Sequence, residues 1–189
     1  MSTVLDHLHA LYAQTDDPWN FATSPYEQAK FRATRGALRR DHYREALEIG
    51  CGNGALAAHL SPLCDRYTGL DAVGRAVAAA RLRVPQATFV QGVYPCRLPL
   101  ERPDLIILSE VLYFLTPDAI ALLASDLIAQ APGAEVICVS YLGDTAQDLQ
   151  GTDALAAFQA AAGADLHLRP VVGAGGYRID AGVIGAAAT

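Results

Sequence analysis

The stretch Ala46-Leu47-Glu48-Ile49-Gly50-Cys51-Gly52-Asn53-Gly54 decides the fold of this chain. A short strand-like run leads into a segment in which every second residue is glycine, and an alanine- and leucine-rich segment follows to about Leu63. Glycine lets the backbone take positive φ and approach a ligand closely, while the N-terminus of the next helix offers free N–H donors. The stretch therefore predicts a strand, a ligand-binding glycine loop and a helix in succession.

The same alternation of strand and helix continues along the chain. Strands are predicted at residues 67–70, 88–90, 104–108 and 135–141, and the apolar runs in the last two indicate parallel strands buried on both faces. Helices are predicted between them, at residues 73–83, 117–131 and 145–162. Two last strands, 166–172 and 177–184, flank a glycine-rich hairpin segment, so the seventh strand returns antiparallel. The predicted fold class is α/β: a doubly wound, seven-stranded, mostly parallel, Rossmann-like sheet that binds its ligand outside the carboxyl ends of its first strands.

The first part of the chain differs from the rest because aromatic and charged residues concentrate there. Ser24 can cap a helix with Pro25 at its first position and Glu27 three residues on, which predicts a helix from about residue 25 to 38. We expect residues 1–43 to form a helical lid over a sheet domain of residues 44–189.

Composition limits the classes of protein to which the chain can belong. Its 189 residues suit one domain, and a 52% hydrophobic content excludes a disordered chain. A net charge of −6 argues against nucleic acid as a partner, and no apolar run is long enough to span a membrane. Four widely spaced cysteines without a CxxC pair indicate reduced thiols in the cytoplasm, and the histidines show no metal spacing. We expect a small-molecule substrate and no metal; the oligomeric state stays open.

The glycine loop fits two classes of cofactor. Residues 50–55 satisfy the dinucleotide fingerprint G-x-G-x-x-G/A, and Asp71 stands about twenty residues on, where an acid binds ribose. Glu48 followed by alternate glycines up to Gly54 is instead typical of S-adenosylmethionine methyltransferases. A nicotinamide enzyme usually adds a substrate domain, for which 189 residues leave no room. Chain length therefore favours the second interpretation, and a nicotinamide-dependent oxidoreductase is the alternative.

Several segments resemble known families. LEIGCGNG (residues 47–54), GLDA (69–72) and PDLIILSEVLYFL (103–115) resemble the cofactor loop, second strand end and fourth strand of class I methyltransferases. More narrowly, DPWNFATSPYEQAKFRATRGAL (17–38) together with SEVLYFL resembles the nodulation N-methyltransferase family, which methylates the free amine of a deacetylated chitooligosaccharide. The resemblance implies S-adenosyl-L-methionine as cofactor and methyl transfer to an amine nitrogen of an amino sugar or related metabolite.

The resemblance also implies which residues hold the cofactor. The glycine loop would wrap the methionine part, Asp71 would bind the ribose hydroxyls, and Lys30 would lie near the methionine carboxylate, with Arg32 in reserve. Trp19 either packs on the sulfonium or only anchors the lid. The third strand departs from the class, because Gly92 and Val93 stand where an adenine-binding acid is common. The full expected set is Trp19, Lys30, Glu48, Gly50, Cys51, Gly52, Gly54, Asp71, Ala72, Gly92, Val93 and Ser109.

The fourth strand supplies the expected catalytic residues, Glu110 and Tyr113, whereas Asp104 lies at its opposite edge and is expected to be structural. A carboxylate can bind and orient an ammonium group and let its proton leave, with Tyr113 assisting. A hydroxyl acceptor usually needs a histidine base, and only His7 and His9 could reach the site from the lid. Nitrogen is therefore favoured; an O-methyltransferase and a catalytically silent cofactor-binding protein are alternatives.

Overall fold

A computed structural model describes residues 4–185 and contains one sheet with the strand order β3-β2-β1-β4-β5-β7-β6. Strands β1 to β5 are parallel, and β7 runs antiparallel to both of its neighbours. The predicted fold class is thereby confirmed. The strands are β1 (Tyr43–Ile49), β2 (Cys64–Asp71), β3 (Thr88–Gln91), β4 (Leu105–Ser109), β5 (Glu135–Tyr141), β6 (Arg169–Ala174) and β7 (Tyr177–Val183).

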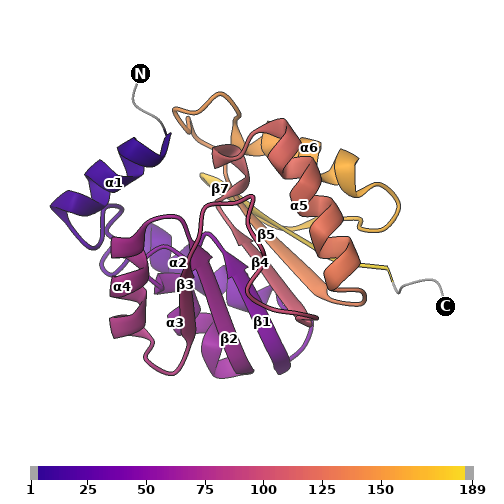
Figure 1. The fold of residues 1–189 in the computed structure, drawn as a ribbon, viewed down its shortest axis with the longest axis horizontal. Coiled ribbons are helices and arrows are strands. Elements are labelled where there is room, and N and C mark those ends of the chain that lie inside the picture. The colour runs from indigo at the N-terminus through magenta and orange to yellow at the C-terminus, as the bar shows by residue number, and fades with distance from the viewer. Residues whose placement is uncertain (1–3, 186–189) are drawn as a thin grey trace.

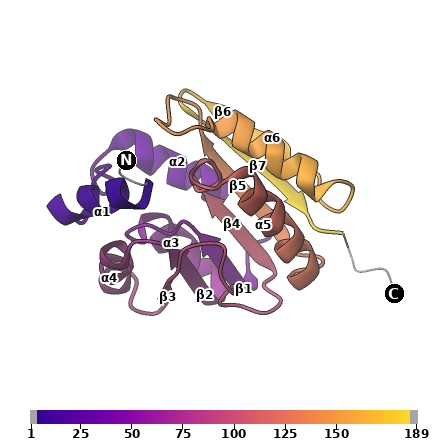
Figure 2. The ribbon, with the colours of Figure 1, turned by 45° about the horizontal axis from the view of Figure 1, so that its top comes forward.

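Helices cover both faces of this sheet. In Figures 1 and 2, α5 and α6 lie side by side on one face, near β4, β5 and β7. Helices α1 and α2 gather at one end of the molecule beside α3 and α4 (Figure 2). The helices are α1 (Val4–Gln14), α2 (Pro25–Gly36), α3 (Ala55–Leu60), α4 (Gly74–Arg83), α5 (Pro117–Gln130) and α6 (Gly151–Ala162), with short 3-10 turns η1 (Ser61–Leu63) and η2 (Leu112–Phe114).

The sheet is buried on both faces because alternate residues of its central strands point to opposite sides. In β4, Ile106 and Leu108 belong to the core under α5 and α6. Leu105 and Ile107 belong to the second core, shared with α2, α3 and α4. This explains why β4 reads as a continuous apolar run rather than an alternating one.

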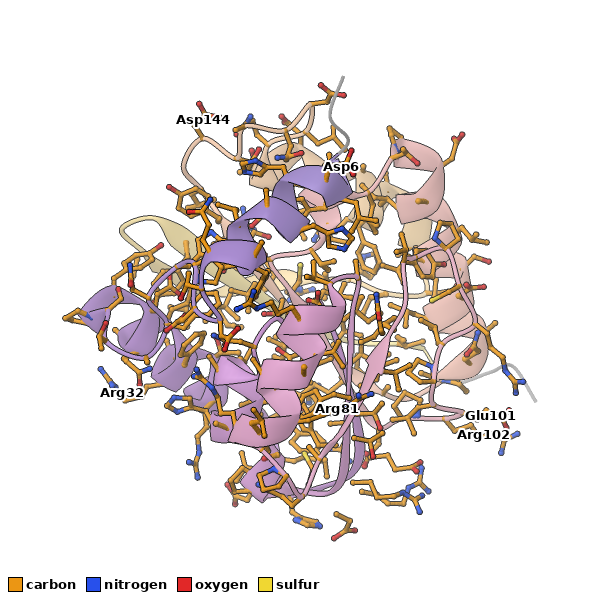
Figure 3. All side chains as sticks on the ribbon, turned by 60° about the vertical axis from the view of Figure 1, so that its left-hand side comes forward. Asp6, Arg32, Arg81, Glu101, Arg102 and Asp144 are labelled. Carbon is orange, nitrogen blue, oxygen red and sulfur yellow. The ribbon has the colours of Figure 1, made fainter. Side chains whose placement is uncertain are left out.

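The predicted helix over residues 145–162 is wrong at its start, because α6 begins only at Gly151. Side chains in the preceding segment bond to the backbone in place of helical hydrogen bonds: Thr145 donates to the Leu149 carbonyl, and Gln150 accepts from the Thr145 N–H. Asp144 accepts from the Ala146 N–H and lies at the tip of this loop (Figure 3).

Smaller differences occur at the two ends of the sheet. β6 begins at Arg169 instead of residue 166, because Leu166 and Leu168 are drawn into the core under α6. β1 begins at Tyr43, so the last residue of the predicted lid segment already belongs to the sheet. Among residues 4–185, no helix is both long and apolar enough to cross a membrane.

Candidate functional site

The glycine loop follows β1 at the carboxyl edge of the sheet. Gly50, Gly52 and Gly54 have φ of 82°, 50° and 75°, in the left-handed region that favours glycine. Gly50 also lies against the end of β4: a Cβ added there would stand 2.7 Å from the Ser109 carbonyl oxygen. Both the conformation and the close approach therefore require glycine at position 50.

Asp71, at the end of β2, fixes this loop directly. Its Oδ2 atom accepts a hydrogen bond of 2.8 Å from the Gly52 N–H, and its Oδ1 atom accepts one of 2.9 Å from the Val73 N–H. Burial raises the pKa of Asp71, while bonds from backbone N–H groups oppose the rise. The structure thus brings together the two predicted parts of the cofactor site, the glycines and the ribose-binding acid.

Glu48 is buried beneath the loop. Its Oε2 atom accepts a hydrogen bond of 2.9 Å from the Tyr67 hydroxyl, whereas Oε1 has no partner among the described residues. Burial, with a smaller contribution from the charge of Asp71, raises the pKa of Glu48 to about 8, although the hydrogen bond from Tyr67 lowers it. The side chain is therefore a neutral carboxyl near pH 7.

The segment before α2 closes over the loop. The Asn53 side chain donates a hydrogen bond of 2.9 Å to the Asp16 carbonyl and one of 3.2 Å to Asp17. Arg75, at the start of α4, donates to Asp16 and to the Ala13 carbonyl. These contacts tie the end of α1 and the turn after it to the glycine loop.

Tyr12 is a site residue that the sequence did not suggest to us. Its hydroxyl is buried, has no partner within residues 4–185, and lies 3.2 Å from the position of a Cβ on Gly52. Burial, Asp71 and Asp17 raise the pKa of Tyr12. The apolar spacing Leu5, Leu8, Tyr12 marks the buried face of a helix and could have revealed it.

Trp19 belongs to a row of aromatic rings within the segment before β1. Its ring stacks on Phe21 with 5.5 Å between centroids and meets Tyr12 edge-on at 5.6 Å. Phe21 in turn contacts the buried ring of Phe31 on α2. Trp19 itself is 39% exposed, so it packs on its neighbouring rings and keeps an accessible face.

Glu110 takes a left-handed conformation directly after β4, with φ of 50°. Its Oε2 atom lies 2.6 Å from Lys30 Nζ, and Lys30 Nζ lies 2.8 Å from Glu27 Oε2. Burial raises the pKa of Glu110 and the Lys30 charge lowers it. Burial opposes the charge on Lys30, but the two carboxylates raise its pKa overall. Lys30 and Glu110, which we expected on cofactor and acceptor respectively, therefore contact each other.

Tyrosines surround this ion pair. The Lys30 ammonium lies 5.5 Å from the centre of the Tyr26 ring. Tyr113 stands in η2, and burial together with Glu110 and Glu27 raises its pKa. The predicted catalytic pair Glu110 and Tyr113 thus shares one electrostatic environment. Arg32, the reserve candidate, extends from α2 to the outside (Figure 3).

The segment expected to hold adenine lies after β3. The Gly92 N–H donates a hydrogen bond of 2.9 Å to the Asp71 carbonyl, and Val93 is 52% exposed. Gln91 donates to the Ala72 carbonyl at 3.3 Å. Gly92, Val93 and Ala72 therefore adjoin Asp71. Within residues 4–185 no three His, Cys, Asp or Glu side chains form a group that could hold a metal ion.

A comparison with protein families identifies the group to which this arrangement belongs. The family model described as "Nodulation protein S (NodS)" matches residues 5–129. The chain belongs to this family. The match runs from α1 into α5 and includes every predicted site residue, so the lid, the glycine loop and Glu110 all lie inside the NodS region.

Individual relatives agree with this assignment. Nodulation protein S of Bradyrhizobium diazoefficiens is 38% identical over 105 residues, which cover 53% of this chain and 50% of the relative. The chain spans about half the length of the curated NodS relatives it matches.

Solved structures show the same fold. The N-methyltransferase NodS from Bradyrhizobium japonicum WM9, in complex with S-adenosyl-L-homocysteine, superposes with a TM-score of 0.81 at 21% identity, covering 95% of this chain and 97% of that one. A putative methyltransferase from Pseudomonas syringae gives 0.70 at 28% identity, covering 84% of this chain and 98% of that one.

Proposed function

We propose that this chain is an S-adenosyl-L-methionine-dependent N-methyltransferase, which transfers a methyl group to the amine nitrogen of a small acceptor. The observation that carries the proposal is the glycine loop after β1, fixed by Asp71 and covered by the segment after α1. Membership of the NodS family and the N-methyltransferase fold of a NodS structure support it. A chitooligosaccharide with one free amine is the leading acceptor.

The residues around the loop fit this cofactor. The hydroxyl of Tyr12, the amide oxygen of Asn53 and one carboxyl oxygen of Glu48 are buried without partners among residues 4–185. Buried polar atoms without partners are rare, because each costs about 1–3 kcal/mol. A ligand with hydroxyl, ammonium and carboxylate groups can complete hydrogen bonds at the mouth of the loop, beginning with Tyr12.

Each predicted residue has a proposed share of the cofactor. The methionine pocket would be shaped by the loop residues Gly50, Cys51, Gly52 and Gly54, with Glu48 and Ser109 beneath them. Asp71 and Ala72 would hold the ribose, and Gly92 and Val93 would hold the adenine. Trp19 and Lys30 would line the remaining, open side of the cofactor pocket. Tyr12 joins this set from the structure. When bound, the cofactor supplies an activated methyl group on a sulfonium with a good leaving group.

The chain's own residues then act mainly by positioning, which can contribute roughly 7–11 kcal/mol to the rate of a well-oriented transfer. Glu110 binds and orients the acceptor ammonium, which must lose its proton before nitrogen can attack. Tyr113 lies beside this carboxylate and limits the movement of the amine. The lid excludes water from the methyl group.

A hydroxyl acceptor fits this site less well. His7 and His9, the histidines that we considered as bases, are both exposed on α1. Close to Glu110 the titratable groups are instead Lys30, Glu27 and the phenols of Tyr26 and Tyr113. This set suits an ammonium group better than a hydroxyl that needs a strong base.

Calorimetry tests the proposal. S-adenosylmethionine and S-adenosylhomocysteine should bind to the protein, whereas NAD should not. Asp71→Ala should weaken binding by at least tenfold, because the ribose hydroxyls lose a charged acceptor worth about 1.5–3 kcal/mol. Asp104→Ala is the matched control, since Asp104 also accepts hydrogen bonds from two backbone N–H groups but lies at the opposite end of the strands. Binding of NAD in place of the sulfonium cofactor would refute the proposal.

Acceptor specificity is tested separately. Deacetylated chitooligosaccharides and glucosamine should be methylated, and analogues with a hydroxyl in place of the amine should not. Glu110→Gln should lower turnover and leave cofactor affinity nearly unchanged. Methylation of the hydroxyl analogues alone would overturn the nitrogen assignment.

A further inference from the structure

We propose that Lys30 is a positioning residue for methyl transfer: it holds the Glu110 carboxylate in the orientation that receives the acceptor ammonium, and Glu27 holds Lys30. The inference rests on the proposed function, since it concerns the same amine site. It adds a role for Lys30 beyond that of a cofactor contact and introduces Glu27, which the sequence suggested only as part of a helix cap.

The backbone of Glu110 is the first observation. A non-glycine residue with φ of 50° carries strain of about 1–2 kcal/mol. The Glu110 N–H is fixed by a hydrogen bond of 3.0 Å to the Val139 carbonyl of β5. This conformation directs the side chain at the end of β4 toward α2, where Lys30 lies 80 residues earlier in sequence.

The burial and charge of the three side chains are the second observation. Lys30 is only 3% exposed, and it is the only lysine in a chain with 13 arginines. Glu27 and Glu110 keep 12% and 19% of their side chains exposed, so a ligand can reach them. Two carboxylates and one ammonium carry a net charge of −1. A second ammonium, brought by the acceptor, would neutralise the group.

The division of oxygen atoms is the third observation. Glu110 Oε2 is committed to Lys30 at 2.6 Å. No side chain of residues 4–185 donates a hydrogen bond to Glu110 Oε1. Glu27 Oε2 lies in ion-pair contact with Lys30 but receives no aligned hydrogen bond from the described residues. One carboxylate oxygen is thus fixed in place while the other remains available to an N–H of the acceptor.

The consequence of losing Lys30 follows from electrostatics. Two neighbouring carboxylates without a cation between them repel each other, so loss of Lys30 raises the pKa of Glu110 further and favours its protonated form. A protonated Glu110 cannot hold an ammonium group. The groups that face Glu110 and set this equilibrium are Lys30, Glu27, Tyr26 and Tyr113, and Tyr141 lies near the two tyrosines. Acceptor binding in Lys30→Met should therefore recover as the pH rises.

A double-mutant cycle tests the role of Lys30. We would measure kcat/KM for the amine acceptor at saturating cofactor in the unaltered chain, Lys30→Met, Glu110→Gln and the double variant. Lys30→Met should lower kcat/KM at least tenfold alone and cause little further loss in the Glu110→Gln background. Lys30→Arg should restore part of the loss. Equal, additive losses in both backgrounds would overturn the inference and leave Lys30 as a cofactor contact only.

A second measurement needs no turnover. Because Lys30 is the only lysine, labelling with [15N]lysine gives a single side-chain Nζ signal in an NMR spectrum. This signal should shift in Glu110→Gln and in Glu27→Gln, and again when glucosamine is added with S-adenosylhomocysteine present. If the chemical shift of Nζ changes neither in Glu110→Gln nor on addition of glucosamine, the inference is wrong, even where cofactor binding supports the proposed function.

Folding is controlled with a matched surface pair. Arg97 and Glu101 lie 2.9 Å apart and are both more than 80% exposed. Arg97→Met removes one cation from an ion pair, as Lys30→Met does, and should change neither kcat/KM nor the Lys30 signal. If Lys30→Met does not fold, Lys30→Arg and Glu27→Gln carry the same comparison. A kcat/KM unchanged in both of these folded variants would overturn the positioning role.

Discussion

Carboxylates lie at both ends of the parallel strands, partly or fully shielded from water, but their hydrogen bonding differs between the two ends. At the edge where the parallel strands begin, Asp104 accepts hydrogen bonds from the Arg44 and Glu45 N–H groups and from Arg40. Glu135 accepts from the Arg39 N–H and the Tyr43 hydroxyl. Every carboxylate oxygen of these two residues has a partner supplied by the chain.

Where the parallel strands end, the hydrogen bonding of the buried polar groups is incomplete by comparison. Glu48, Tyr12 and Asn53 each have a buried polar atom without a hydrogen bond from the described residues. Glu110 is strained there, and the glycine loop adds three left-handed residues. Polar atoms without hydrogen-bond partners and strained backbone conformations occur together here. This combination indicates a site at which a ligand supplies the missing hydrogen bonds. The residues where the strands begin therefore stabilise the fold, whereas those where the strands end lower its stability and favour ligand binding.

Glycine substitutions provide the largest test of this contrast. Gly50→Ala combines left-handed strain with a contact of 2.7 Å to the Ser109 carbonyl, so we expect a loss of about 2–5 kcal/mol in the free energy of unfolding, together with loss of cofactor binding. Gly133 has a similar φ of 80° between α5 and β5, but nothing lies within 4 Å of its added Cβ.

Gly133→Ala is therefore the matched control and should cost only the strain, about 1–2 kcal/mol, with unchanged cofactor affinity. Urea unfolding and calorimetry measure both quantities. Equal losses in the two variants would show that the close approach of β1 to β4 has no special cost.

Much of the contrast could be predicted from sequence because it is local. The spacing of glycines after an apolar run indicated the loop, and Asp71 was expected nearby as a ribose-binding acid, since parallel strands end at the same edge. The hydrogen bond from the Gly52 N–H to Asp71 was not predicted. Asp104 was correctly expected at the opposite edge. In each case the limits of a strand and the turn next to it determine at which end of the strand the side chain lies.

The remaining features depend on tertiary docking. The contact between Lys30 and Glu110 joins residues 80 apart and requires a left-handed glutamate, which no intrinsic preference of that residue predicts. Tyr12 reaches Gly52 only because α1 packs against α4 through Val73 and Ala76. Residues 145–150 depart from the predicted helix because Thr145 and Gln150 bond locally.

The pH dependence of stability offers the next largest effect. Burial raises the pKa of Glu48 to about 8, from about 4.3 in an unfolded chain. The folded state holds the extra proton between these values, so stability falls as pH rises from about 4.5 to 8. Glu48→Gln cannot ionise and should show a flatter profile, with a difference on the order of 3 kcal/mol between pH 5 and 8.5. Parallel profiles of unfolding by urea would contradict the neutral carboxyl.

Asp104 should give the opposite sign. Although burial opposes ionisation, bonds from the Glu45 and Arg44 N–H groups and the charge of Arg40 hold the pKa of Asp104 below its usual value. Its stabilisation is complete above the unfolded pKa of about 3.9 and is lost as pH falls through the folded value. Asp104→Asn should cost about 1–2 kcal/mol at pH 7 and less at pH 3. An equal cost at both pH values would contradict this assignment.

The smallest expected effect on stability distinguishes a buried tyrosine hydroxyl without a hydrogen-bond partner from one that has a partner. Tyr12 buries its hydroxyl without a partner in the described residues, so Tyr12→Phe should leave the free energy of unfolding unchanged or raise it by less than about 1 kcal/mol. Tyr43 donates a hydrogen bond of 2.6 Å to Glu135, so Tyr43→Phe should lower stability by about 1 kcal/mol. Affinity for S-adenosylhomocysteine should respond in the reverse pattern, falling several-fold in Tyr12→Phe and remaining constant in Tyr43→Phe. Thermal unfolding and calorimetry on both variants decide the matter, because a destabilised Tyr12→Phe with full affinity would make that hydroxyl structural and move Tyr12 out of the binding edge.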